Sequence, residues 1–225
     1  MVFPLAMGIC FAGVSPSLQR ADFESNAKRS WQGPWGGGID GGHGGGEFAK
    51  AGNENFSHSP KYAARLDTWD DGSPKALAWS CLRQRVRCSP GGHMKAGVWI
   101  YSSSSVAPLA SSNVTVQLRV EYFSDDDGDR IIPTDVVLSR PFGPAFGDKP
   151  DEWHRVFVSG RVPDGAKCLG LSIVLMVQKP GSTRQSIWVD DADLELSGPG
   201  RANQPVPRGK VVPDDFPWWK QLFGP

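Results

Sequence analysis

The sequence predicts an all-β protein, a two-sheet antiparallel β-sandwich of the jelly-roll type with a long Gly-rich loop and an extended C-terminal arm. Three observations support this fold class. Short segments of alternating apolar and polar residues recur along the chain, separated by turn residues. No amphipathic helix is evident between residues 60 and 196. Gly (27 residues) and Pro (19 residues) are abundant, as in loop-rich β proteins.

The chain divides into three parts. Residues 1–20 form an apolar leader, either a remnant of an export signal or an additional strand. Residues 21–196 are predicted to form the β-sandwich domain, and 225 residues suffice for one such domain with a sizeable core. Residues 197–225 are a Pro/Gly-rich arm with an aromatic end. The formal net charge of +0 gives no global basic field for nucleic acid, and no apolar run is long enough for a transmembrane helix.

The predicted elements follow in chain order. A short first strand at 21–30 precedes a Gly-rich stretch at 31–57, which lacks a phosphate-binding motif and is interpreted as a long, flexible surface loop carrying two tryptophans. The acidic run at 124–129 favours a solvated hairpin turn over a metal loop, because Phe123 would occupy the first ligand position of an EF-hand. The other strands are predicted at 62–67, 76–88, 95–102, 114–122, 153–162, 169–177 and 187–196.

The cysteines do not form a recognisable zinc pattern. Side-chain alternation places Cys88 on the inner face of its strand and Cys81 on the opposite face, so a bridge between these two is not expected. Cys88 is predicted to be a buried thiol or the partner of Cys168. The four cysteines are Cys10, Cys81, Cys88 and Cys168.

Carboxylates gather near both ends of the predicted domain. The last strand carries Asp190 and Asp191 side by side, which is costly inside a strand unless a cation or hydrogen bonds offset the charge. Asp22 and Glu24, near the start of the domain, supply further oxygen ligands. A hard cation near the ends of paired first and last strands would explain both features.

Aromatic and polar side chains are predicted to point away from the core on several strands. Aromatic rings stack on the apolar face of a sugar, and neighbouring polar groups bind its hydroxyls, so these residues predict a carbohydrate platform. The alternatives are a solvated sheet face or a face covered by the C-terminal arm. The candidate ligand-binding residues are Trp99, Tyr101, Arg85, Gln117 and Arg119, with Trp35 and Trp69 as loop candidates.

Several segments, in this order, resemble the carbohydrate-binding-module jelly rolls of the galactose-binding-like superfamily, in particular those attached to xylanases and glucanases. The resemblance covers roughly residues 21–196, while the Gly-rich insertion, Cys88 at a usual aliphatic position and the C-terminal arm depart from the pattern. The matching segments are D-F-E at 22–24 followed by Trp31, Y-A-A-R-L at 62–66, Q-R-V-R-C-S-P-G at 84–91, V-W-I-Y-S at 98–102, Trp153, V-P-D-G-A at 162–166 and W-V-D-D-A-D-L at 188–194.

The resemblance implies a structural calcium site that joins the first and last strands. Its ligands would be Glu24 and Asp190, with Asp22 or Asp191 as helpers and backbone carbonyls completing the shell; the alternative is that these carboxylates are solvated at strand ends. It also implies that two tryptophans, Trp31 and Trp153, pack in the core.

No catalytic motif is evident. The four histidines form no metal-binding doublet, and there is no G-x-S-x-G nucleophile elbow. The prediction is therefore a non-catalytic, calcium-stabilised carbohydrate-binding-like domain of an exported protein, which binds a polysaccharide or glycan outside the cell, in the periplasm or at the cell surface.

The C-terminal sequence D-D-F-P-W-W-K-Q-L-F-G-P supports an alternative function. Such an aromatic segment usually docks on its own domain, a partner subunit or a membrane interface. The alternative is thus a structural or assembly subunit of a larger extracellular or membrane-associated complex, with the Gly-rich loop also docking; peripheral membrane attachment is a third reading. The predicted docking residues are Phe216, Trp218, Trp219, Leu222 and Phe223.

Overall fold

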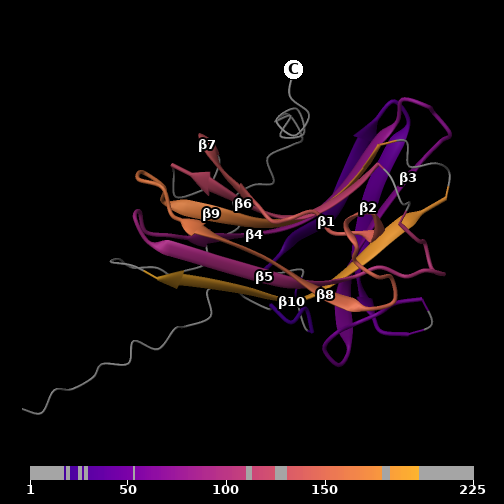
Figure 1. Ribbon diagram of the computed structural model, residues 1–225, viewed down its shortest axis with the longest axis horizontal. Coiled ribbons are helices and arrows are strands. Elements are labelled where there is room, and N and C mark those ends of the chain that lie inside the picture. The colour runs from indigo at the N-terminus through magenta and orange to yellow at the C-terminus, as the bar shows by residue number, and fades with distance from the viewer. Residues whose placement is uncertain are drawn as a thin grey trace, which may run out of the picture.

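The computed structural model describes residues 18, 21–24, 27, 30–52, 54–109, 113–124, 131–178 and 183–197, and within these ranges it is almost entirely β-structure (Figure 1). A short 3-10 turn, η2 (Pro144–Phe146), lies between β7 and β8. The strands are β1 (Gln32–Ile39), β2 (Gly42–Lys50), β3 (Tyr62–Asp70), β4 (Leu77–Arg87), β5 (His93–Tyr101), β6 (Val114–Phe123), β7 (Ile131–Leu138), β8 (Trp153–Arg161), β9 (Cys168–Gln178) and β10 (Gln185–Ser197).

The strands form two five-stranded antiparallel sheets, which confirms the predicted β-sandwich. The first sheet has the order β1-β4-β9-β6-β7 and the second the order β2-β3-β10-β5-β8. Neighbours in a sheet are mostly distant in sequence, so the chain crosses repeatedly between the layers, as in jelly rolls. In the described part of the chain, no helix is long and apolar enough to cross a membrane.

The core lies between the two sheets. Because successive side chains of a strand point to opposite faces, alternate residues of each strand enter it. In the first sheet the register aligns Leu82, Ile173 and Leu118 in one inward-facing row. Trp31, only 1% exposed, packs in this core as predicted, and so does Leu18, the one described residue of the predicted leader.

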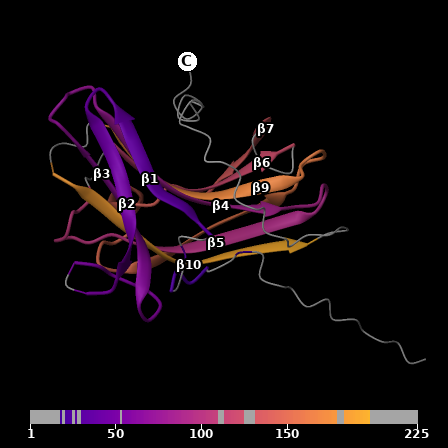
Figure 2. The same cartoon turned by 180° about the vertical axis from the view of Figure 1, so that it is seen from behind.

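The Gly-rich stretch is two regular strands, so its prediction as a flexible surface loop is wrong. β1 pairs with β4 in the first sheet, while β2 pairs with β3 in the second, although a tight turn at Asp40 and Gly41 joins them. Figure 2 shows β1 and β2 running steeply across the other strands at one end of the sandwich. This hairpin therefore connects the two layers.

Close backbone approach explains why glycine fills these strands. A Cβ atom on Gly44 would overlap the carbonyl oxygen of Trp79, and one on Gly42 would overlap that of Leu77. Sheets that pack through side chains lie about 10 Å apart. Here the backbone of β2 lies directly on that of β4, which only glycine allows.

Two other expectations differ from the structure. The predicted strand at 21–30 is absent from its described residues, where Ala21 contributes only a carbonyl that accepts a hydrogen bond from the Ala192 amide at 2.9 Å. The structure also contains β7, which was not predicted. The strands expected from residue 62 onward are all present. Most of the acidic turn, most of the leader and nearly all of the arm lie outside the described residues.

The cysteine prediction is confirmed where it can be followed. Cys81 faces outward from β4, and Cys88 lies in the core between the sheets. Cys81, Cys88 and Cys168 are all buried free thiols, so Cys88 does not pair with Cys168. Cys10 lies outside the described residues.

Candidate functional site

The predicted carbohydrate platform is divided between the two outer faces of the sandwich. The five residues predicted on strands face outward as expected, but their placement on one face is wrong. Trp35 and Trp69, predicted in loops, lie in strands β1 and β3 instead. Side-chain alternation fixes whether a residue faces in or out, yet not which sheet its strand joins. The first sheet carries Trp35, Arg85, Gln117 and Arg119, and the second carries Trp69, Trp99 and Tyr101.

On the first sheet, the register of β4, β9 and β6 brings together the side chains on its outer side, most of them buried in the folded chain, and we call this set the basic–aromatic face. One row contains Trp79, Met176 and Thr115, and the rows that follow become progressively more polar. Trp35 of β1 lies opposite Cys81 of β4 at the apolar end. The basic–aromatic face consists of Trp35, Trp79, Cys81, Arg83, Arg85, Arg87, Thr115, Gln117, Arg119, Glu121, Phe123, Cys168, Gly170, Ser172, Val174 and Met176.

The apolar half of this face is a second hydrophobic cluster, separate from the core. Trp35 is half-buried and packs on Leu77, Trp79, Cys81, Val174 and Met176. The ring of Trp79 lies beside Gly37, where a Cβ would come within 3.3 Å of the ring, so a glycine at this position gives the indole room. The five side chains that Trp35 contacts lie on the outer side of the sheet but are buried in the folded chain, and Trp35 is the member that stays partly exposed.

The basic half is organised around one carboxylate. The carboxylate of Glu121 forms ion pairs with Arg83 and, at 2.7 Å, with the Nε of Arg119. The guanidinium groups of Arg83 and Arg85 lie 5.0 and 5.5 Å from the centroid of the Phe123 ring. A Cβ on Gly170 would lie 2.7 Å from the Nε of Arg83, so this glycine provides the floor on which the guanidinium rests.

Burial sets the electrostatics of the basic half. Burial, reinforced by repulsion from Arg85, lowers the pKa of Arg83 to about 10, and burial also lowers the pKa of Arg119. Both arginines therefore remain protonated near neutral pH, but their charge is less well solvated than usual. Burial raises the pKa of Cys81 to about 12, so its thiol is protonated and a poor nucleophile.

On the second sheet, the chain's own loop covers much of the aromatic surface. Phe56 stacks on Tyr101 with ring centroids 4.4 Å apart, and His58 stacks on Trp99 at 4.3 Å. Trp188 is completely buried beneath Phe56. Trp99 and Tyr101 each therefore have one ring face in contact with a residue of the chain's own loop.

Two more tryptophans lie on this second face. Trp153 packs beside Tyr101 at 5.4 Å and is half-buried on the outside of β8, so its predicted place in the core is wrong. Trp153 and Val156 lie three residues apart on β8, so their side chains point to opposite faces of the strand. Val156 faces the core, and Trp153 therefore faces outward. Trp69 is half-buried between His43, at 5.7 Å, and the guanidinium of Arg184, at 5.4 Å.

Oxygen atoms from the two ends of the domain converge near Ser59. Its hydroxyl lies 3.3 Å from Glu24 Oε1, 3.2 Å from Asp190 Oδ2 and 3.4 Å from the carbonyl oxygen of Asp22. Asp190 is completely buried, and its carboxylate accepts backbone hydrogen bonds from His58, Ser59 and Asp191, each at 2.8 Å. Burial nevertheless raises the pKa of Asp190 to about 6.

The other two predicted metal-binding side chains point elsewhere. The carboxylate of Asp191 contacts the His58 ring at 2.6 Å, and that of Asp22 accepts from the Glu24 amide at 3.3 Å. Only the carbonyl of Asp22 reaches the cluster at Ser59. The described residues contain no cluster of three or more His, Cys, Asp or Glu side chains suited to a metal, so any cation here would depend on the mixed set of carboxylate, hydroxyl and carbonyl oxygens.

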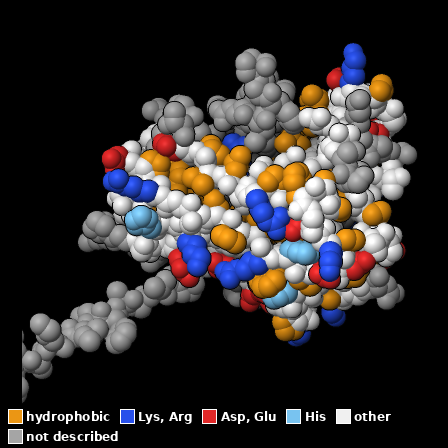
Figure 3. Space-filling view, viewed as in Figure 1, with side chains coloured by type: hydrophobic (Ala, Val, Ile, Leu, Met, Phe, Trp, Pro, Cys, Tyr) orange, Lys and Arg blue, Asp and Glu red, His pale blue; other side chains and the backbone are white. Residues whose placement is uncertain are grey.

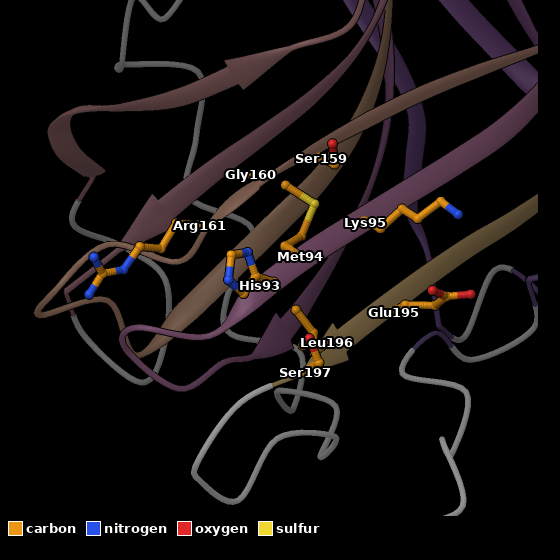
Figure 4. A pocket seen from close by; sticks show the side chains of 9 residues that line it. All are labelled: His93, Met94, Lys95, Ser159, Gly160, Arg161, Glu195, Leu196 and Ser197. Atoms are coloured by element: carbon orange, nitrogen blue, oxygen red, sulfur yellow. The ribbon is translucent and has the colours of Figure 1, made fainter.

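A cavity of about 490 Å³ lies at the far end of the second sheet, between β5, β8 and β10 (Figure 4). Met94 and Leu196 contribute its apolar surface, and Arg161 points away from Lys95 and Glu195. Its polar groups do not converge on one point, which a specific ligand site requires. The view in Figure 3 shows mixed acidic, basic and histidine side chains along the lower part of the molecule, with only small hydrophobic patches between them.

Sequence reasoning missed two kinds of site residue. Trp79 and Phe123 have the same outward alternation as Arg83 and Gln117, so this signal was available for them. Ser59 lies in a loop without periodicity, and nothing in its sequence context indicated that it meets Glu24 and Asp190.

Comparison with known proteins supports the fold. No family model matches the sequence, and no curated protein does. Among solved structures, the enzymatically active domain of bacteriophage CBA120 tailspike protein 4 matches with a TM-score of 0.55 and 14% identity, over 80% of this chain and 21% of that chain. Carbohydrate-binding modules of the β-sandwich superfamily, described as having promiscuous specificity, match with a TM-score of 0.50 and 13% identity, over 77% of this chain and 60% of that chain.

These matches define the class of fold. The chain has the jelly roll of carbohydrate-binding modules, which confirms the resemblance found in the sequence. At such low identity the likeness concerns the fold alone. The chain also spans less than two thirds of the length of either structure.

Proposed function

We propose that this protein is a non-catalytic, calcium-stabilised carbohydrate-binding domain of an exported protein, and that its basic–aromatic face binds the glycan. The observation that carries the proposal is the outer face of the first sheet, where a Trp cluster continues into a row of arginines. Aromatic rings and bidentate polar donors on one surface are the groups that hold a sugar ring and its substituents. The second sheet is a weaker candidate, because Phe56 and His58 already occupy its aromatic rings.

The chemistry of the face favours binding over catalysis. Glycoside hydrolysis generally requires two carboxyl groups on either side of the scissile bond. Among the described residues of the basic–aromatic face, Glu121 is the one carboxylate, and two arginines hold it. The protonated thiol of Cys81 does not supply an alternative nucleophile.

Calcium is proposed for the oxygen cluster at Ser59, where the donors suit a hard cation. Asp190 and Glu24 would provide charge, and the Asp22 carbonyl and Ser59 hydroxyl neutral oxygens. The buried Asp190 carboxylate would gain a counter-charge, which fits a stabilising role. The ion would tie the start of the domain to β10.

Replacing Trp35 is expected to weaken glycan binding. Trp35→Ala removes the half-buried ring from the apolar half of the face, and we expect the dissociation constant to rise about tenfold or more, as for other aromatic anchors. Affinity electrophoresis in gels containing soluble xylan, mixed-linkage glucan or polygalacturonate measures this, after a thermal melt shows that the variant is folded.

Trp69→Ala is the matched control, since Trp69 is also half-buried but lies on the outer face of the second sheet. We expect its glycan binding to equal that of the wild type. If Trp69→Ala lost binding and Trp35→Ala kept it, the glycan site would belong on the second sheet.

The aromatic C-terminal sequence supports a second candidate function, that of an assembly subunit. Its predicted docking residues lie outside the described part of the chain, so only experiment tests them. Removal of residues 198–225 is expected to leave glycan binding unchanged if the arm is a linker. Light scattering that shows a discrete oligomer for the full chain and a monomer after the deletion would instead establish the arm as an assembly element.

A further inference from the structure

The basic–aromatic face is buried more deeply than the other outer face of the sandwich. On β8, at the outer side of the second sheet, burial alternates as on a solvated face: Arg155 and Phe157 are exposed, and Val156 between them is buried. No member of the basic–aromatic face is exposed, and β9 is buried on both of its sides as far as Val177. A strand that is buried on both sides has a layer on each side of it.

The described strands supply a layer on the inner side only. Each belongs to the first or the second sheet, so no described strand forms a third layer over the outer side of β4, β9 and β6. The described loop that stacks on aromatic rings of a sheet, residues 56–58, lies over the second sheet. Trp35 packs beside the apolar half but belongs to the same layer. Trp79, Val174 and Met176 are nevertheless only 7%, 5% and 4% exposed, so something outside the described residues covers them.

The cover belongs to the same chain, because these burial values are those of a single chain. Two long segments lie outside the described ranges, residues 1–17 and residues 198–225. The longest of the other gaps, 125–130, links β6 to β7 next to Phe123. It lies at the end of the face far from Trp79, about 26 Å away along the strands, and is too short to reach it. The cover is therefore one of the two long segments.

Composition favours the C-terminal arm over the leader. Residues 1–17 contain no acidic side chain, whereas the arm has Asp214 and Asp215 directly before its aromatic residues. The Nε of Arg87, in the basic half of the face, is buried and has no hydrogen-bond acceptor within the described part of the chain. A covering segment that brings carboxylates suits such a donor, and an uncharged segment leaves it unpaired.

The arm also leaves the domain at the basic end of the face. Ser197, which precedes the arm, lies against the turn between β4 and β5, where a Cβ on Gly92 would overlap the Ser197 carbonyl oxygen. That turn follows Arg87, the last residue of β4, so the face changes from basic to aromatic with distance from this point. The arm changes in the matching order, from acidic to aromatic. Its linker at 198–213 can span about 50 Å when extended, more than the length of the face.

We propose that the aromatic end of the arm docks on the basic–aromatic face of its own chain, with Trp218 and Trp219 against the apolar half and Asp214 and Asp215 toward Arg87. Docking buries apolar surface that a sandwich of two layers would otherwise expose. It stands independently of the proposed function. If the face also binds a glycan, as proposed above, the arm and the glycan compete for it, and the docked arm lowers the apparent affinity.

Thiol labelling of the full chain tests the docking, since Cys81 lies in the apolar half of the face and Cys88 lies between the sheets. Burial raises the pKa of both thiols to about 12, so their intrinsic reactivities are matched. Combined Trp218→Ala and Trp219→Ala substitutions are expected to speed the reaction of Cys81 with N-ethylmaleimide about tenfold or more and to leave Cys88 protected. Peptide mass spectrometry after timed labelling measures both rates.

Phe11→Ala is the matched control, because Phe11 lies in the other long segment. It is expected to leave the labelling of Cys81 at the wild-type rate. If it exposed Cys81 and the arm substitutions did not, the leader would be the cover and the proposal would be wrong. Protection of Cys81 that appears only at high protein concentration would assign the arm to a second copy and overturn docking within one chain.

Hydrogen exchange of the wild-type chain gives a readout that needs no substitution. Residues 214–223 are expected to exchange about tenfold or more slowly than an unfolded peptide of the same sequence, and exchange at the unfolded rate would contradict the docking.

Affinity electrophoresis in xylan or mixed-linkage glucan tests the competition. The double arm variant is expected to bind about tenfold more tightly than the wild type if the face is free of the arm in about one molecule in ten. Unchanged affinity with an exposed Cys81 would remove the competition and support the docking alone. Glycan binding by neither protein would count against the proposed function, while the labelling and exchange results still decide the docking.

Discussion

Gly44→Ala is expected to destabilise the protein by about 3 kcal/mol or more, because the added methyl group has nowhere to go. Its Cβ would overlap the carbonyl oxygen and carbon of Trp79, which belong to the backbone of β4. A flexible side chain can rotate away from such a contact, but a backbone within two paired ladders cannot. Overpacking of this kind commonly costs about 1–3 kcal/mol and more where the surroundings are rigid.

The neighbouring residue supplies the control. A Cβ on Gly45 would meet nothing within 4 Å, and Gly45 belongs to the same strand. Gly45→Ala is therefore expected to leave stability unchanged or to raise it by about 0.5 kcal/mol, since alanine restricts the unfolded chain. Urea unfolding followed by tryptophan fluorescence compares the two variants at one calcium concentration.

Equal stabilities for the two variants would contradict the close approach of β2 and β4 and restore the loop interpretation of this region. Failure of Gly44→Ala to fold, when Gly45→Ala folds normally, would agree with the expected result. The comparison therefore tests the part of the fold that differs most from the sequence-based prediction.

The Gly-rich strands show why part of the fold was not predictable. Strand prediction relies on alternating apolar side chains and β-branched residues, and a run of glycines provides neither. β2 is a strand because it pairs along its whole length with β3, and its glycines are set by close contact with the backbone at Leu77 and Trp79, which lie far away in sequence. β7 was missed for a related reason, since Pro133 within a short apolar run argues against a strand, yet Pro is tolerated on an edge strand such as β7.

The candidate site was predicted in its local features and not in its assembly. Side-chain alternation correctly predicted that Arg85 and Arg119 face outward and that Cys81 and Cys88 lie on opposite faces of the first sheet. Alternation also correctly predicted that Trp99 faces outward, but Trp99 lies on the second sheet, because its strand β5 pairs with β10 and β8. Strand pairing between distant segments is decided by the whole core, so a local pattern does not reveal which outward residues share a surface.

Removal of calcium is expected to make the folded protein less stable at neutral pH, because the buried Asp190 carboxylate then has no cation beside it. Burial raises its pKa to about 6 in the folded protein, above the ordinary value of 3.8. The folded state then binds more protons than the unfolded state between these pH values, so in EDTA the contribution of Asp190 to stability is present below about pH 4 and is lost as the pH rises through about 6. A cation at the Ser59 cluster would favour the ionised form and oppose this loss.

We therefore expect calcium to raise the melting temperature by about 5–10 °C at pH 7, at a free concentration near one hundred times its dissociation constant, and by much less at pH 4.5. Asp190→Asn is expected to reduce the calcium-induced shift to below about 2 °C and to flatten the pH dependence in EDTA. The NH₂ group of the asparagine would also face backbone amides that now donate to the Asp190 carboxylate, which lowers the stability of this variant whether or not calcium binds. The readout is for that reason the calcium-induced shift within each variant, measured by differential scanning calorimetry.

Asp191→Asn separates a metal site from a general loss of negative charge. It removes a charge from the adjacent residue, whose carboxylate contacts His58 instead of the Ser59 cluster. Its calcium-induced shift should match that of the wild type. If neither substitution changed a large calcium-induced shift, the ion would bind elsewhere in the chain. If wild-type protein showed no shift at pH 7, the calcium proposal would be wrong, and hydrogen bonds from backbone amides and from the Ser59 hydroxyl would compensate these two carboxylates without an ion.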